Sequence, residues 1–119
     1  MMRTILYLII DNCGKIPEHH FVIDSQGFVL KKHPTGKPVK ILGRRDDPDG
    51  YNAFSIAIRV SRAPEYYRPL QHETLVDLLV RLRRIYPEAM ILGLSEIGAY
   101  RIKVSKRMNQ LRRELSDRY

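Results

Sequence analysis

The chain has 119 residues, a formal net charge of +8 and a single cysteine, Cys13. This length fits one domain with a continuous core, which we place at residues 1–119. One cysteine excludes an internal disulfide framework, and by itself it cannot make a structural zinc site, which takes several protein ligands. The excess of Lys and Arg favours acidic partners, namely nucleic acid, anionic lipid or a carboxylate-rich cell-wall peptide.

The N-terminal segment "MMRTILYLII" has one basic residue followed by a short apolar stretch. That stretch is too short for a signal peptide, and no apolar run approaches the roughly 20 residues that span a bilayer. We therefore expect a cytoplasmic protein with no membrane role.

The first half of the chain is predicted to form strands. Residues 4–10 are an apolar run typical of a strand covered on both faces. Residues 20–24 and 28–31 flank "SQG", a connection of hairpin length that ends in Gly. Residues 39–43 indicate a short edge strand, and residues 44–50 a polar loop.

Residues 53–60 alternate between larger apolar and small side chains, as in a central strand packed by a helix. The larger residues are Phe54, Ile56, Ile58 and Val60, and the small ones are Ala53, Ser55 and Ala57.

The second half is predicted to hold two helices and a strand. A helix begins at Pro69 and ends before Pro87. Its apolar stripe is Leu75, Leu78, Leu79, Leu82 and Ile85. Residues 89–93 indicate a buried strand. A last amphipathic helix begins near Val104, and its apolar face is Val104, Met108, Leu111 and Leu115. These elements predict an α/β domain with a mixed central β-sheet and amphipathic helices packed on its faces.

Few residues suggest chemistry by their spacing. His19 and His20 are adjacent, so in a strand they point to opposite faces and cannot bind one metal together in regular geometry. The "DDPDG" run at 46–50 lacks the closing glutamate of a calcium loop, which favours a turn. Cys13 has no identifiable general base near it in sequence, which favours a packed thiol over a nucleophile.

The order of these pieces carries a resemblance. The hairpin "HFVIDSQGFV", the run "GYNAFSIAI", the helix "PLQHETLVDLLVRLRRIYP" and the strand "AMILG" follow the first strand in that order. Over roughly residues 3–98 the chain resembles the zinc-dependent N-acetylmuramoyl-L-alanine amidases, the family of phage lysozyme-type amidases and peptidoglycan recognition proteins. The resemblance implies an amidase-like fold, truncated because the helix between the first strand and the hairpin is missing.

The resemblance also implies a zinc site whose ligand positions are altered here. The first ligand position, a histidine in the family, is Asp11 or, with the cysteine aligned, Asn12. The second, also a histidine in the family, is Leu94 in "LGLSE", and the third, a cysteine or aspartate, falls near Ile102. Leucine offers no lone pair to a metal, while Glu96 keeps the acidic position two residues later. His19 stands where the family has its catalytic tyrosine. The resemblance therefore predicts a pseudoenzyme that needs no zinc or other cofactor and does not hydrolyse peptidoglycan by the family mechanism.

A remaining groove over the sheet is expected to bind a peptidoglycan fragment or muramyl peptide, or a protein partner. The groove residues are Asp11, Asn12, His19, His20, Asn52, Ser55, Leu94, Glu96, Arg101 and Lys103. Arg101 and Lys103 are expected to pair with ligand carboxylates.

Three alternatives stay open. A divergent active zinc amidase would use a displaced metal site built from Asp11, Cys13, His19 or His20. A basic module for nucleic acid or protein would use the last helix, and the absence of interleaved aromatic residues argues against single-strand binding. The basic residues of that helix are Lys103, Lys106, Arg107, Arg112 and Arg113. The last helix and the truncated groove also suggest a homodimer.

Overall fold

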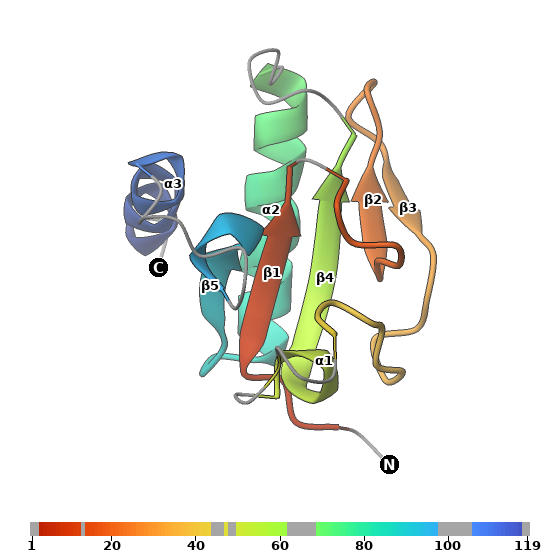
Figure 1. The fold of residues 1–119 in the computed structure, drawn as a ribbon. Coiled ribbons are helices and arrows are strands. Elements are labelled where there is room, and N and C mark those ends of the chain that lie inside the picture. The colour runs from red at the N-terminus through yellow and green to blue at the C-terminus, as the bar shows by residue number, and fades with distance from the viewer. Residues whose placement is uncertain are drawn as a thin grey trace.

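The computed structural model describes residues 3–12, 14–43, 47, 50–61, 69–97 and 106–117. These residues form a five-stranded sheet of order β3-β2-β4-β1-β5 (Figure 1). The strands are β1 (Tyr7–Asp11), β2 (Phe21–Ile23), β3 (Val29–Lys31), β4 (Ser55–Val60) and β5 (Met90–Gly93). Strands β2, β4, β1 and β5 are parallel, while β3 is antiparallel to β2. The predicted mixed sheet, the hairpin and the buried first strand are confirmed.

Two amphipathic helices cover one face of the sheet, α2 (Pro69–Ile85) and α3 (Lys106–Ser116) (Figure 1). The apolar stripe of α2 is buried against β1 and β4 as predicted, except that Ile85 at its end is 60% exposed. The predicted residues Met108, Leu111 and Leu115 of α3 are also buried, so the apolar face of α3 is covered within the chain. Neither helix is long and apolar enough to cross a membrane, which holds for all the described residues.

The other face of the sheet is covered by connecting segments instead of a long helix. Residues 14–20 and 34–43 lie over it and bring apolar side chains onto β1 and β4 (Figure 1). We call this set the front cluster; its buried members are Ile9, Ile16, Val39, Ile41, Leu42, Ala57, Leu94 and Ile97. Strands β1 and β4 are thereby buried on both faces, although both long helices lie on one of them.

The prediction of an edge strand at residues 39–43 is wrong, because these residues form no strand. The backbone N–H groups of Ile41 and Leu42 each donate to Oδ1 of Asn52 at 2.8 Å, and the Nδ2 group of Asn52 donates to the Leu42 carbonyl at 2.8 Å. One amide side chain thus takes the place of a strand neighbour. This frees the apolar side chains of the segment to pack on the face of the sheet instead of along its edge.

The predicted strand 53–60 begins later than expected. Residues Tyr51–Phe54 form a short helical turn, α1, and the strand starts at Ser55. Gly50 enters the turn with φ of 73°, and the side chain of Asp47 accepts hydrogen bonds from the N–H groups of Tyr51 and Asn52. This carboxylate satisfies N–H groups that a first helical turn leaves without partners. Phe54 consequently is 37% exposed and does not share the buried face of Ile56.

Candidate functional site

Asp11 ends β1 and is fully buried, at the position where the resemblance places a metal ligand. Its Oδ1 accepts from the N–H groups of Gly14 at 2.9 Å and Lys15 at 3.3 Å, and its Oδ2 accepts from the N–H of Ile16 at 3.1 Å. The Nε2 of His19 also lies 2.9 Å from Oδ2, and because a carboxylate only accepts, this nitrogen carries the proton. Asp11 therefore holds the tight connection after β1, and both of its oxygens are already engaged.

His20 is fully buried beside β4. Its Nδ1 accepts the N–H of Ala57 at 3.0 Å, so the neutral ring carries its proton on Nε2, which donates to the Lys37 carbonyl at 2.6 Å. Burial lowers the pKa of His20 to about 4, and the nearby Arg3 guanidinium acts in the same direction, against the opposing effect of the Lys37 carbonyl. His20 is therefore a neutral structural bridge between β4 and the segment that follows β3.

The lowered pKa of His20 predicts that folding weakens in mild acid. An unfolded chain takes up a proton at His20 near pH 6.5, whereas the folded chain does so only near pH 4. As the pH falls through this window the unfolded state binds more protons, so up to about 3 kcal/mol of stability is lost. Urea unfolding of the wild type and of His20→Gln at pH 7, 5.5 and 4.5 measures this directly. The stability difference between them should shrink as the pH falls, and a difference independent of pH would contradict the assignment.

The positions predicted to line the groove around the sheet are mostly buried parts of the fold. Leu94 is 5% exposed and belongs to the front cluster, beside Ile9 and Ile97. Ser55 is fully buried on β4, and its Oγ has no hydrogen-bond partner among the described residues. Asn52 is engaged with the backbone of residues 41–42. At position 94, where the resemblance predicts a metal ligand, the side chain therefore packs among apolar residues.

Glu96 pairs with Arg112 of α3 at the outer edge of β5. Arg112 Nη1 lies 2.8 Å from Glu96 Oε1, and Nη2 lies 2.9 Å from Oε2. The hydrogen bond to Glu96 raises the pKa of Arg112. The same pair bonds the strand, because Arg112 donates to the Ile91 carbonyl at 2.9 Å and Glu96 accepts the N–H of Gly93 at 2.9 Å. The outward backbone groups at this edge of the sheet are therefore bonded by side chains. Arg112 belongs to a basic helix, but its guanidinium binds groups within the chain.

The described residues do not assemble a cluster of metal-binding side chains. Within these, no group of three or more His, Cys, Asp and Glu side chains is placed to hold a metal ion. Asp11 and His19 do lie together, but Leu94 brings no donor atom, so this part of the chain does not fit the zinc site that the resemblance implies. Cys13, Arg101, Ile102 and Lys103 lie outside the described residues.

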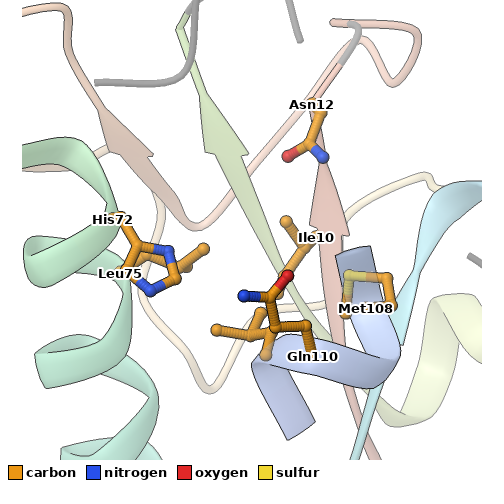
Figure 2. A pocket seen from close by; sticks show the side chains of 7 residues that line it. Ile10, Asn12, His72, Leu75, Met108 and Gln110 are labelled. Atoms are coloured by element: carbon orange, nitrogen blue, oxygen red, sulfur yellow. The ribbon is translucent and has the colours of Figure 1, made fainter. Parts of the chain in front are cut away.

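A cavity of about 190 Å³ opens between the carboxyl end of β1 and the two long helices (Figure 2). It is lined by Ile10, Asn12, His72, Leu75, Met108, Gln110 and Leu111. Its walls are mostly apolar, but the Oδ1 of Asn12 is buried and has no hydrogen-bond partner among the described residues. At the rim, His72 Nε2 lies 2.7 Å from Glu114 Oε2 and links α2 to α3. Among the predicted groove residues that the structure describes, Asn12 is the one that lines this cavity.

Neither a model of a protein family nor a curated protein matches the sequence. Solved structures do match the fold. Endolysin N-acetylmuramoyl-L-alanine amidase LysCS from Clostridium intestinale URNW superposes with a TM-score of 0.70 at 15% identity, covering 95% of this chain and 85% of that one. The fold is that of the amidase endolysins.

Two further amidase-fold structures agree. N-acetylmuramoyl-L-alanine amidase LysC from Clostridium intestinale URNW gives a TM-score of 0.68 at 14% identity, over 95% of this chain and 87% of that one. Ph2119 endolysin from Thermus scotoductus MAT2119 bacteriophage Ph2119 gives 0.67 at 12% identity, over 96% and 86%. The amidase-like fold predicted from the order of motifs is therefore confirmed.

Sequence reasoning missed two features of this amidase-fold chain. The spacing of Leu75, Met108 and Leu111 predicts core residues, and nothing in it indicates that their packing leaves a cavity. The basic residues of the last helix predict a surface position for Arg112, whereas it lies between Glu96 and the edge of β5. A partial signal was present, since Arg112 follows the buried Leu111 and an acidic residue remained at 96.

Proposed function

We propose that this chain is a non-hydrolytic domain of the amidase fold that binds a fragment of peptidoglycan. The absence of hydrolysis is inferred from the surroundings of Asp11 and Leu94, the two ligand positions that the structure describes. Asp11 is engaged by the backbone of the following turn and by His19, and Leu94 is packed among apolar side chains. Amide hydrolysis by the route that the resemblance implies needs a metal with an open coordination position, and these residues do not supply its ligands.

The cavity beside Asn12 supports the second half of the proposal. Its volume is too small for a whole muramyl peptide but suits one small group of it. An apolar wall accepts a methyl group, and the buried Oδ1 of Asn12 needs a donor such as an amide N–H. An N-acetyl group or an alanyl residue carries both, and the net charge of +8 favours a ligand with carboxylates.

Metal content separates a non-hydrolytic domain from a divergent active amidase. The purified protein is exposed to excess zinc, desalted and measured by plasma mass spectrometry beside a His19→Ala/His20→Ala double variant. We expect no zinc at stoichiometric level and no release of peptide from peptidoglycan, with a known zinc amidase as the positive control. Near-stoichiometric zinc that disappears in the double variant would overturn the proposal.

Ligand binding is tested by NMR titration with muramyl dipeptide. We expect chemical-shift changes to concentrate at the residues that line the cavity, and Asn12→Leu to raise Kd about tenfold because it removes the acceptor at nearly constant volume. The exposed Gln26→Ala is the matched control and should leave Kd unchanged. Saturable binding that Asn12→Leu does not alter would place the ligand elsewhere, and no binding would refute the peptidoglycan proposal.

A further inference from the structure

The two edge strands of the sheet, β5 and β3, differ in whether their outward backbone groups are bonded. At β5, the Glu96–Arg112 pair bonds the outward N–H of Gly93 and the outward carbonyl of Ile91. At β3 no such cover is present among the described residues, and its apolar side chains face solvent: Phe28 is 67% exposed, and Val29 and Leu30 are each 41% exposed. An open edge with apolar side chains is a template for another strand.

The hydrogen bonds of the β2–β3 hairpin show which β3 groups point outward. The N–H of Asp24 donates to the Phe28 carbonyl at 2.9 Å, and the N–H of Lys32 donates to the His20 carbonyl at 2.8 Å. Bonded pairs alternate along an antiparallel ladder, so Leu30 faces β2 with its backbone groups. The N–H and carbonyl groups of Val29 and Lys31 therefore point away from the sheet.

We propose that β3 pairs antiparallel with β3 of a second copy, with Leu30 facing the second copy's Leu30, so that two sheets join into one. In this register Val29 lies opposite the second copy's Lys31, and both residues have their backbone groups pointing outward. Each of the two Val29–Lys31 pairs then exchanges a pair of hydrogen bonds. The pairing rests on the sheet edge alone and is independent of the ligand proposal.

The charges of β3 select this register over its neighbours. Two lysines follow the apolar residues, a feature that commonly keeps edge strands from pairing. With Leu30 at the centre, Lys31 faces Val29 and Lys32 faces Phe28, so that no lysine lies directly opposite another. If the second copy is shifted by two residues toward the C-terminal end of β3, Lys31 lies directly opposite the second copy's Lys31. Two like charges in that position are unfavourable. A shift the other way runs the pairing into the turn at Gly27, whose φ is 85°.

Cysteine crosslinking tests the register in a Cys13→Ser background. Leu30 and its copy form a non-bonded pair with Cα atoms about 4.5 Å apart, which suits a disulfide. Val29 and its own copy are diagonal neighbours, about 7 to 8 Å apart, which is too far. We expect Leu30→Cys to form a covalent dimer on mild oxidation and Val29→Cys to stay monomeric. Crosslinking of Val29→Cys at the same rate or faster would overturn the register.

Sedimentation equilibrium up to about 1 mM protein tests the association itself, since a millimolar dimer is measurably populated there. Val29→Pro removes the outward N–H without touching the bonds to β2, a substitution that edge strands tolerate. We expect it to weaken self-association at least about tenfold, because both copies lose a hydrogen bond. Val29→Thr keeps the N–H and is the matched control, with circular dichroism verifying that both variants fold. A monomer at every concentration, or equal association of the two variants, would refute the proposal.

Discussion

Replacing Asp11 with alanine is expected to lower the free energy of unfolding by about 3 to 5 kcal/mol, because several buried donors lose their acceptor and each unsatisfied one costs about 1 to 3 kcal/mol. The change removes the acceptor for three backbone N–H groups and for His19 at once. The bonds from the Ile16 N–H and from His19 are buried, so that water cannot readily replace the carboxylate at these two donors. Equilibrium urea unfolding followed by circular dichroism measures the loss.

Two matched variants make the Asp11 result specific. Asp11→Asn keeps one acceptor oxygen, so its loss should be smaller, about 1 to 3 kcal/mol. Asp77→Ala removes an exposed carboxylate on α2 and should change stability by no more than about 0.5 kcal/mol. A loss below about 1 kcal/mol for Asp11→Ala would mean that Asp11 does not organise the connection, and would reopen its use as a metal ligand.

Changing Leu94 to histidine restores the ligand type that the resemblance places there, yet we expect no zinc site and a stability loss of at least about 3 kcal/mol. Losing a buried leucine side chain costs about 2 to 5 kcal/mol. An imidazole without partners in the front cluster adds about 1 to 3 kcal/mol. Asp11 and His19 would stay bonded to each other, so the new nitrogen would meet no free pair of ligands.

Urea unfolding and zinc titration calorimetry of Leu94→His test both expectations. Leu94→Met is the control, because it keeps the volume and the apolar character and should cost less than about 1.5 kcal/mol. Tight zinc binding by Leu94→His, with a zinc-dependent gain in stability, would show that the site needs only this one residue. The proposal of a non-hydrolytic domain would then describe a protein one substitution away from metal binding.

The elements with a clear period could be predicted from the sequence. The stripe of α2 matches the repeat of a helix with one buried face, and the alternation of large and small residues from Ser55 to Val60 matches the repeat of a strand. Two predictions failed where a polar side chain replaces a backbone partner. Asn52 bonds residues 41–42 and prevents an edge strand, and Asp47 caps a helical turn before β4. Hydrogen bonds from a side chain to the backbone of another segment leave no periodic pattern in the sequence, so they could not be predicted from it.

The candidate site divides in the same way. Leucine at position 94 has no donor atom for a metal. This is a property of the residue type, so the sequence alone determined it. The sequence also determined the order of strands and helices, because each has its own periodic burial. Only the tertiary structure decided that Asp11 is engaged by its own turn, that Glu96 bonds Arg112 at β5 and that a cavity lies beside Asn12. Each of these depends on distances between segments far apart in the chain, which are set by packing and not by local pattern.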